Sequence, residues 1–462
     1  MDEESCDLAV IGAGPGGMAS ALHAASRGLE VVLVNGGGLL GCGLQGAYKS
    51  KGLWELAKDC VVAHKAGRGY APAGPGLRFD EIHAQLESGV RELTGMYRRY
   101  LDAAGIRTID GWGRFVDPHV VAVGDRRIRA RWIILAAGTR PRVPPGIAAD
   151  GTRILTSDHV VDIDRPFGSL LVVGAGVIGC EFASIFSAFG VKVTLLDRAD
   201  RLLGQEDADL SDHIAAVYRR NDIDVRFGAS LASLRADGEG ILAVLAGGAE
   251  VRADRALIAT GRVACTDGLN PGAAGVVAAP DGFIEVDDHL RTNVPHVYAI
   301  GDMGRRKPPL DLALAHVAEA EGRWAVKHIL GEPSTFQPDY VPFIIFTLPM
   351  IAGAGLTERQ ARERHGEVRV AKFLNARNHR YHAMRSFEGF VKLIVGPPGD
   401  DRILGVRAVG PQADNVIGEA AVLIDNKIPY TYLLDAVHAH PSLAESLQNG
   451  ARMIAGTLPA TF

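Results

Sequence analysis

The sequence predicts an α/β fold in which two strand–turn–helix–strand modules precede an α+β segment. The first observation is the glycine-rich turn GAGPGG at residues 12–17, which follows the apolar strand DLAVIG. The second is the return of the same arrangement at residues 169–197, SLLVVGAGVIGCEFASIFSAFGVKVTLLD. The third is the stretch after residue 337, where strand-like and helix-like segments alternate. Strands linked through helices in this way are typical of a parallel sheet with helices on its faces.

The composition is that of an ordinary globular protein. The chain has 462 residues, of which 47% are hydrophobic and 22% are charged. This length predicts about three domains at roughly 150 residues each. The net charge of -5 gives no global basic field that would favour nucleic acid or an anionic membrane.

No segment predicts secretion, a membrane span or a metal site. The N-terminal sequence MDEESCDLAVIG is acidic and leads directly into a strand, unlike a secretory signal. The apolar stretch 341–355 is short and interrupted by proline. The five cysteines are odd in number and lack metal-ligand spacing, and those other than Cys42 are interpreted as reduced thiols. We therefore expect a cytoplasmic protein without a metal.

The first glycine-rich turn has the spacing of a dinucleotide-binding site. Gly12 permits the tight turn, Gly14 lets the backbone approach a pyrophosphate, and Gly17 allows close packing of helix on strand. The helix predicted over 18–28 directs its positive N-terminal end at the phosphates. The next strand ends at Asn35, where an acidic residue is usual, although an amide oxygen still accepts a hydrogen bond from a ribose hydroxyl.

The second turn repeats these roles with Gly174, Gly176 and Gly179. Asp197 ends the following strand, where a carboxylate accepts hydrogen bonds from both ribose hydroxyls and repels a 2′-phosphate. This favours NAD(H) over NADP, although the adjacent Arg198 weakens the preference. Two such modules in one chain are most simply explained by one bound flavin and one exchangeable nicotinamide nucleotide.

Three later segments fit the same scheme. Residues 131–146 and 255–269 are apolar strands that end in turns of small residues. Residues 292–303, TNVPHVYAIGDM, form a strand that ends in Gly301 and Asp302. A carboxylate at the end of a strand is well placed to hold a ribityl or ribose hydroxyl, and a helix N-cap is the alternative role for Asp302.

Together these motifs resemble the pyridine nucleotide–disulfide oxidoreductases and, within them, the dihydrolipoamide dehydrogenases. The resemblance covers nearly the whole chain and includes VIGAGPGG, VVGAGVIGCEFAS, IATGR, YAIGDM, LAHVAEAEG and VHAHPSLAES. It implies an FAD domain split by an inserted NAD domain, then a dimerisation domain, in a homodimer whose active sites use both subunits. The implied bounds are 1–149 and 271–337 for the FAD domain, 150–270 for the NAD domain and 338–462 for the dimerisation domain.

By resemblance, the nucleotide-binding residues extend beyond the two turns. Those implied to hold FAD are Gly12, Gly14, Gly17, Asn35, Lys51, Gly138, Gly301, Asp302, Ala315 and His316. Those implied to hold NAD(H) are Gly174, Gly176, Gly179, Glu181, Asp197 and Gly261.

The segment HAHPSLAE contains the candidate catalytic base. In the resembled family the histidine before proline is the base and a glutamate five residues later orients it, and His440 and Glu445 match both positions. Imidazole titrates near neutrality, and a carboxylate partner stabilises its charged form. The alternative is a hydrogen-bonded interface histidine, which is the favoured interpretation of His438. The peptide bond between His440 and Pro441 is open to either isomer.

The family's redox loop, with the pattern C-x-x-x-x-C-x-P-S-K, departs here at one cysteine. Cys42 matches the cysteine that meets the substrate, but Ala47 stands where the cysteine beside the flavin is found. Lys51 matches the lysine beside the flavin, and Glu181 matches its acidic partner. One thiol forms no internal disulfide, so the usual relay is interrupted, whereas the residues for hydride exchange between nicotinamide and flavin are retained.

Cys42 is interpreted either as an inert small residue or as a reactive thiol. A nearby base and two lysines favour a lowered pKa and a mixed disulfide with a substrate. The favoured function is an FAD-dependent, NAD(H)-linked oxidoreductase that acts on a thiol or dithiol, either a small molecule or a lipoyl carrier. His440 and Glu445 then serve as the base, and the substrate supplies the missing sulfur.

Two other functions stay open. One is an NAD(P)H-dependent reductase of a quinone or dye, or a transhydrogenase, although soluble transhydrogenases do not normally carry the HAHP tail. The other is a non-catalytic flavoprotein subunit of a larger complex. The basic stretch NARNHRYHAM at 375–384 is interpreted as a solvated face, with binding of an acidic substrate or carrier as the alternative.

Overall fold

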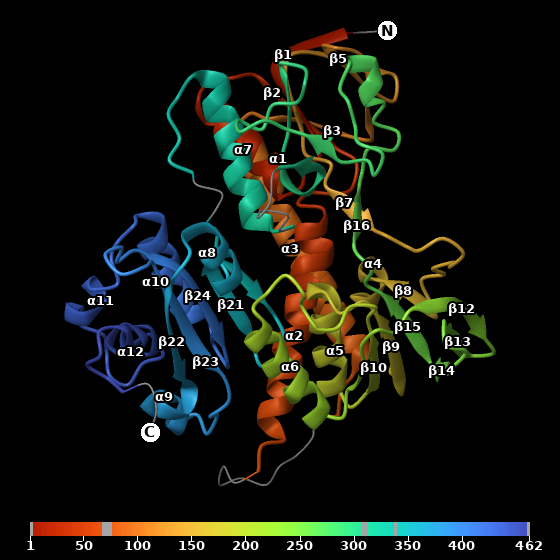
Figure 1. The fold of residues 1–462 in the computed structure, drawn as a ribbon. Coiled ribbons are helices and arrows are strands. Elements are labelled where there is room, and N and C mark those ends of the chain that lie inside the picture. The colour runs from red at the N-terminus through yellow and green to blue at the C-terminus, as the bar shows by residue number, and fades with distance from the viewer. Residues whose placement is uncertain (1–2, 67–75, 307–312, 337–339, 460–462) are drawn as a thin grey trace.

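The computed structural model describes residues 3–66, 76–306, 313–336 and 340–459. These residues form three main sheets with helices on their faces (Figure 1). Two of the sheets are built around parallel strands and the third is antiparallel. The predicted α/β class with an α+β C-terminal part is confirmed.

The first sheet has seven strands in the order β3–β2–β1–β6–β5–β4, with β18 paired to β6. The strands are β1 (Glu3–Ile11), β2 (Val31–Asn35), β3 (Arg107–Asp110), β4 (Gly113–Asp117), β5 (Val120–Val123), β6 (Arg126–Leu135) and β18 (Val297–Ala299). β2 is buried along its whole length, as expected for a parallel strand covered on both faces. β18 lies parallel to β6 with Val297 opposite Ile133, so a segment far along the chain completes this sheet.

Two helices cover the first turn. α1 (Pro15–Ser26) connects β1 to β2, and α7 (Ala315–Leu330) packs across it. The crossing is close, since a Cβ at Gly322 would lie 2.4 Å from the backbone oxygen of Gly16. The middle of α7 is thereby brought to the start of α1.

The second sheet is a five-stranded parallel sheet in the order β11–β10–β9–β15–β8. Its strands are β8 (Ile154–Thr156), β9 (Ser169–Val173), β10 (Lys192–Leu196), β11 (Asp224–Arg226) and β15 (Arg255–Ile258). α5 (Val177–Ala188) links β9 to β10, and α6 (Ala208–Arg220) precedes β11. A small antiparallel sheet of β12 (Leu231–Asp237), β13 (Gly240–Leu245) and β14 (Glu250–Ala253) lies beside it.

The third sheet is antiparallel in the order β20–β21–β24–β23–β22. Its strands are β20 (Phe343–Ile345), β21 (Ile351–Gly355), β22 (Arg369–Leu374), β23 (Phe390–Val395) and β24 (Ile403–Val409). The helices around it are α8 (Glu358–His365), α9 (His379–Ala383), α10 (Asp414–Asp425), α11 (Tyr432–Asp435) and α12 (Glu445–Ile454). The amphipathic helix predicted over 415–426 corresponds to α10.

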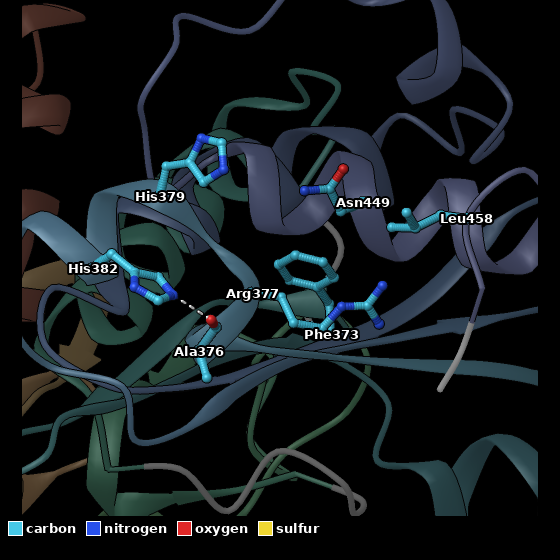
Figure 2. A pocket seen from close by; sticks show the side chains of 7 residues that line it. All are labelled: Phe373, Ala376, Arg377, His379, His382, Asn449 and Leu458. Atoms are coloured by element: carbon cyan, nitrogen blue, oxygen red, sulfur yellow. Dashed lines mark hydrogen bonds between the residues drawn. The ribbon is translucent and has the colours of Figure 1, made fainter. Parts of the chain in front are cut away.

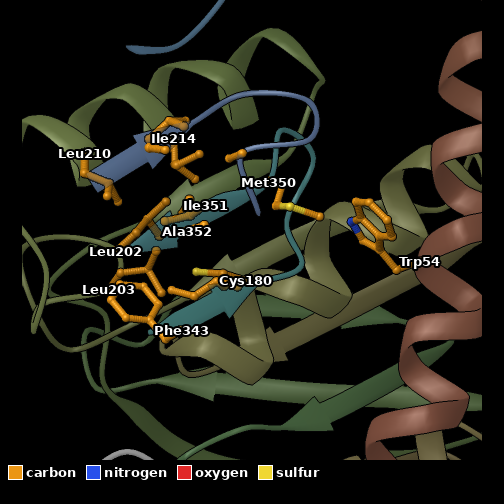
Figure 3. Close-up of a cluster of buried hydrophobic side chains, with 14 of the residues drawn as sticks. Trp54, Cys180, Leu202, Leu203, Leu210, Ile214, Phe343, Met350, Ile351 and Ala352 are labelled. Atoms are coloured by element: carbon orange, nitrogen blue, oxygen red, sulfur yellow. The ribbon is translucent and has the colours of Figure 1, made fainter. Parts of the chain in front are cut away.

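A hydrophobic core joins the second and third sheets to α2 (Lys49–Ala63), as Figure 3 shows. Trp54 of α2 donates its Nε1–H to the backbone oxygen of Thr347 at 3.0 Å and meets Phe346 edge to face. Met350 and Cys180 belong to the same buried cluster. The helix that follows Cys42 is therefore held by two other parts of the chain.

Three sequence predictions concern where helices, membrane spans and domains begin and end. α1 begins at Pro15, three residues before the predicted start, because the glycines of the turn already form its first turn. In the described part of the chain, no helix combines the length and the hydropathy that a membrane span requires. The expected boundary at residues 337–338 lies outside the described residues.

Candidate active site

In the turn between β1 and α1, Gly12 and Gly17 are closely packed and Gly14 is open, as the sequence predicted for a site that admits a phosphate at Gly14. Gly12 has φ +111°, and a Cβ there would lie 2.4 Å from the oxygen of Ala136. A Cβ at Gly17 would lie 1.9 Å from the oxygen of Gly12, so this glycine lets helix and strand touch. A Cβ at Gly14 would meet one atom, at 3.9 Å, and the backbone there is open to a phosphate at the helix N-terminus.

Asn35 gives an independent sign of a ligand at this turn. Its Nδ2 donates to Oδ1 of Asp110 at 2.7 Å, which orients the amide. Its Oδ1 is buried and has no hydrogen-bond partner in the described part of the chain. Because buried acceptors are nearly always satisfied, the residues of this turn fit an adenosine ribose of FAD, whose hydroxyl would donate to that oxygen.

The second turn has the same geometry. Gly174 has φ +108°, a Cβ at Gly179 would lie 1.8 Å from the oxygen of Gly174, and no atom lies within 4 Å of a Cβ at Gly176. Asp197 follows β10, and its two carboxylate oxygens accept backbone N–H groups of Ala175 at 2.5 Å and Ala199 at 2.8 Å. The carboxylate is thus held at the mouth of the turn, and the residues fit a nicotinamide dinucleotide.

The remaining predicted nucleotide-binding residues lie at strand ends. The oxygen of Gly138 accepts the N–H of Cys265 at 2.9 Å, and the oxygen of Gly261 accepts that of Arg142 at 2.9 Å. These bonds join β7 (Thr139–Pro141) and β16 (Arg262–Ala264), which pair in an antiparallel ribbon.

Gly301, Asp302, Ala315 and His316 lie around the start of α7. The N–H of Gly301 donates to Glu321 at 2.6 Å, and Oδ2 of Asp302 accepts from Oγ1 of Thr139 at 3.3 Å. Burial raises the pKa of Asp302 and raises that of Glu321 to about 7. Ala315 is the first residue of α7, whereas the ring of His316 turns toward the C-terminal part and contacts the oxygen of Pro342 at 2.7 Å.

Cys42 begins a π-helical segment, Gly43–Tyr48, that continues into α2. The sequence predicted a glycine-rich loop for this stretch, whereas the structure has a helical segment there. Ala47 is exposed within it, and all five cysteines, which the described residues include, are free. The Sγ of Cys42 lies 3.8 Å from Nη2 of Arg262, and Arg262 is itself held by Thr139 through its Nε and Nη2.

Of the two interpretations of Cys42, the reactive thiol of lowered pKa is contradicted. Cys42 is exposed at the surface, but desolvation by the surrounding protein raises the pKa of its thiol, and the neighbouring Arg262 only partly opposes the effect. The two lysines invoked for it are engaged elsewhere. Lys49 is buried between Glu87 and Asp162, and Lys51 pairs with Glu181.

We expect iodoacetamide to alkylate Cys42 slowly at pH 7, with the rate rising only above the ordinary thiol range. Arg262→Met should slow the reaction further at a given pH, because it removes the charge that favours the thiolate. The check is the rate of carbamidomethylation of the Cys42 peptide against pH by mass spectrometry, with free N-acetylcysteine as reference. Faster alkylation of Cys42 than of the reference at pH 7 would contradict the prediction.

Lys51 and Glu181, which lie on different modules, meet as expected. Nζ of Lys51 lies 3.1 Å from Oε2 of Glu181, and the other carboxylate oxygen accepts the N–H of Phe346 at 2.8 Å. The ammonium also lies 4.6 Å from the centre of the Phe346 ring. Two other parts of the chain thus fix the position of this lysine.

The candidate base His440 and its candidate partner Glu445 are also together. Nδ1 of His440 lies 2.8 Å from Oε1 of Glu445, and Oε2 accepts the N–H of Ser442 at 2.7 Å. Burial opposes ionisation of Glu445, but its hydrogen bonds with His440 and Ser442 lower its pKa. The His440–Pro441 bond is cis. His438 is separate and contacts Glu419 at 3.0 Å, as expected for a hydrogen-bonded histidine.

The His440–Glu445 pair and the Cys42 segment lie far apart within one chain. α11 and α12, which flank His440, lie at the outer edge of the C-terminal part in Figure 1. α4 (Ser157–Val160), which packs against the segment after Cys42, lies on the other side of the molecule. The side chain of His440 is 58% exposed, which leaves it accessible to another molecule.

Sequence reasoning missed three residues that shape the site. Arg262 approaches Cys42, Asp110 orients Asn35, and Glu321 receives the N–H of Gly301. Arg262 belongs to the IATGR motif and Glu321 to the LAHVAEAEG motif. Both motifs indicated the family, but neither motif by itself indicated what these two side chains contact. Asp110 ends a neighbouring strand, and only the strand order brings it to Asn35.

The chain belongs to the pyridine nucleotide-disulphide oxidoreductase family. The model of that family matches residues 6–322, and the model of its dimerisation domain matches residues 341–451. The chain is therefore an FAD-dependent pyridine nucleotide oxidoreductase of the dihydrolipoyl dehydrogenase type.

Its relatives carry more than one activity in their names. The chain is 32% identical to dihydrolipoyl dehydrogenase 3 of Haloarcula marismortui, over 97% of this chain and 96% of that protein. It is also 32% identical to the soluble pyridine nucleotide transhydrogenase of Mycobacterium bovis, over 96% of each. Among solved structures, LpdA of Mycobacterium tuberculosis is similar at a TM-score of 0.90 and 27% identity, over 98% of this chain and 99% of that one. RclA of Escherichia coli, described as an HOCl-induced flavoprotein disulfide reductase, is similar at a TM-score of 0.86 and 26% identity. The similarity covers 97% of this chain and 99% of that one.

Proposed function

We propose that this protein transfers electrons between NAD(H) and a thiol or dithiol substrate of lipoyl type without an internal redox disulfide. The observation that carries the proposal is the hydrogen-bonded His440–Glu445 pair, 2.8 Å apart, in a chain whose second cysteine position is Ala47. A base of this kind serves to remove a thiol proton. Such a base is required here if the substrate supplies the thiol that the loop lacks.

The complete site forms between two subunits. The exposed His440 and the distant Cys42 segment support this arrangement, as does the family's dimerisation domain at residues 341–451. In it, His440 of one subunit faces Cys42, Lys51 and the flavin site of the other. The absence of a side chain beyond Cβ at Ala47 leaves space for a substrate thiolate.

The residues of this chain then have distinct tasks. His440 takes the thiol proton, and Glu445 holds the ring and stabilises the imidazolium that forms. Lys51, fixed by Glu181, holds positive charge at the flavin site, and Asp197 selects NAD(H) by its ribose hydroxyls. FAD, when bound, supplies two-electron transfer between nicotinamide and substrate. Cys42 is positioned to contact the substrate sulfur.

Anaerobic titration of the FAD-loaded protein tests the missing disulfide. We expect NADH to bleach the flavin absorbance after one two-electron equivalent, with no long-wavelength band from a cysteine thiolate beside the flavin. NADPH should bleach it only at much higher concentration, because Asp197 disfavours a 2′-phosphate. Uptake of a second two-electron equivalent would reveal another redox centre and contradict the proposal.

A second candidate function is direct transfer from the reduced protein to a quinone, dye or second nicotinamide. The relative from Mycobacterium bovis named as a transhydrogenase favours it. Steady-state assays with reduced lipoamide and with a quinone, each paired with the nicotinamide, separate the two. Turnover of the quinone alone would select the second candidate, and failure of NADH to reduce the flavin would favour a non-catalytic subunit.

A further inference from the structure

His379 lies directly against the candidate base, although it is 61 positions away in the sequence. It is the first residue of α9, and its Nδ1 lies 3.3 Å from Nε2 of His440. The two rings meet edge to face, with centres 5.1 Å apart and planes at 81°. The basic stretch at 375–384 is therefore more than a solvated face, because one of its histidines contacts His440.

Buried hydrogen bonds fix this contact. Asn378, which precedes α9, is 3% exposed, and its Nδ2 donates to the oxygen of Ser442 at 3.0 Å and to Oγ of Ser446 at 2.9 Å. Ser442 is also the residue whose N–H holds Glu445. The segment carrying His379 and the segment carrying His440 are thus joined through one buried amide.

The contact decides which nitrogen is open to a substrate. Glu445 engages Nδ1 of His440, so that nitrogen carries a proton in the neutral ring, and Nε2 of His440 accepts from His379. Within the described residues, Nε2 of His379 has no hydrogen-bond partner, and the residue is exposed. His379 also lines a surface pocket of about 440 Å³, shown in Figure 2.

We propose that His379 passes the substrate proton to His440, an inference that rests on the proposed function. Nε2 of His379 takes the proton of the substrate S–H, and the proton on Nδ1 of His379 moves to Nε2 of His440. The products are a substrate thiolate and a His440 imidazolium held by Glu445, so protons and charge balance. The working base is then a chain of three side chains rather than a pair.

The same helix offers a matched control. His382 lies on α9 and lines the same pocket, but its Nε2 contacts the oxygen of Ala376 at 2.6 Å (Figure 2). No contact joins it to His440 among the described residues. His382→Asn therefore tests for general effects of losing an imidazole from this helix.

His379→Asn is the decisive variant, because an amide NH₂ can still donate to Nε2 of His440 but cannot relay a proton. We expect His379→Asn and His379→Phe to lower the ratio of thiol to NADH–quinone turnover by roughly 10- to 100-fold, whereas His382→Asn leaves it within about twofold. Adding His379→Asn to His440→Gln should lower thiol turnover no further, because the residues of one proton relay act as a unit. In mixtures of H₂O and D₂O, the wild-type rate should show two transferring protons and that of His379→Asn one.

Thiol turnover by His379→Asn within about twofold of wild type, or an increase, would overturn the relay and leave His379 a structural neighbour. Equal thermal midpoints of wild type and variant show that lost turnover is not lost folding. If His440→Gln itself keeps thiol turnover, the proposed function fails. If only the His379 variants keep it, this inference alone fails.

Discussion

Replacing His440 with glutamine is expected to lower turnover of a thiol substrate by about 10²- to 10⁴-fold, the usual worth of a positioned general base. Glutamine keeps a side chain of similar reach but cannot take up a proton. Glu445→Gln should lower thiol turnover by a smaller factor, because it leaves the imidazole in place and removes only the charge that stabilises the protonated imidazole. The measurement is kcat and kcat/KM with reduced lipoamide and NAD, in the direction that consumes the thiol.

The matched control is His438→Gln, two residues earlier, whose ring contacts Glu419 instead. It tests whether loss of any histidine in this segment disturbs the site. The NADH–quinone reaction, which requires no thiol proton transfer, serves as reference for the amount of competent flavin. A His440→Gln protein with full thiol turnover would refute the assignment of the base.

Replacing Lys392 with methionine is expected to destabilise the folded protein by about 3–5 kcal/mol, the range for removing one partner of a buried ion pair. Lys392 of β23 is 4% exposed, and its Nζ lies 3.1 Å from Asp207, 3.2 Å from Asp209 and 2.6 Å from Glu358. Asp207 is equally buried. Because Asp207 and Asp209 belong to the start of α6, the lysine ties the second sheet to the third.

The neighbouring Lys372 provides a control at the facing position of β22. It is 38% exposed and contacts only Asp209 at 2.9 Å among the carboxylates of the described residues. Lys372→Met should therefore cost no more than about 1 kcal/mol. Adding Asp207→Asn to Lys392→Met should restore part of the loss, since it removes the uncompensated charge. Urea unfolding with a common m-value measures all three.

The effect of Lys392→Met should depend on pH. Burial opposes ionisation of Asp209 and Glu358, but the lysines and, for Glu358, Arg362 hold the pKa of both carboxyls below the ordinary range. Carboxyls of lowered pKa add stability above their unfolded pKa, about 4, and lose it as pH falls through the folded value. The difference between wild type and Lys392→Met should thus be largest above about pH 5 and shrink below about pH 4. A constant difference across this range would exclude the ion pairs as its cause.

The nucleotide turns were predictable because their chemistry is local. Gly12 and Gly17 are required by backbone contacts within one strand–turn–helix unit, and the repeat at Gly174 and Gly179 has nearly identical contacts. His440 and Glu445 lie five residues apart, and their pairing was predicted because both positions match the motif of the resembled family. For such features, spacing in the sequence is close to spacing in space.

The environment of Cys42 was not predictable. One of the two interpretations of this residue was a thiol acidified by lysines near in sequence. Lys49 and Lys51 instead pair with Glu87, Asp162 and Glu181, and Arg262 lies against the thiol. A pKa depends on enclosure and on charges within a few ångströms, and these come from other strands and helices.

The sequence by itself therefore determined the fold class and the two dinucleotide turns, since each follows from residue type and short-range spacing. Its resemblance to the family supplied the candidate base His440 and the prediction that Ala47 stands in place of a second cysteine. The tertiary structure decided what surrounds them: that Arg262 lies against Cys42, that Asp110 orients Asn35, and that His379 contacts His440. It also separated the base from the Cys42 segment within one chain. The physical reason is that strand order and packing, rather than distance along the chain, set which side chains share hydrogen bonds and charge.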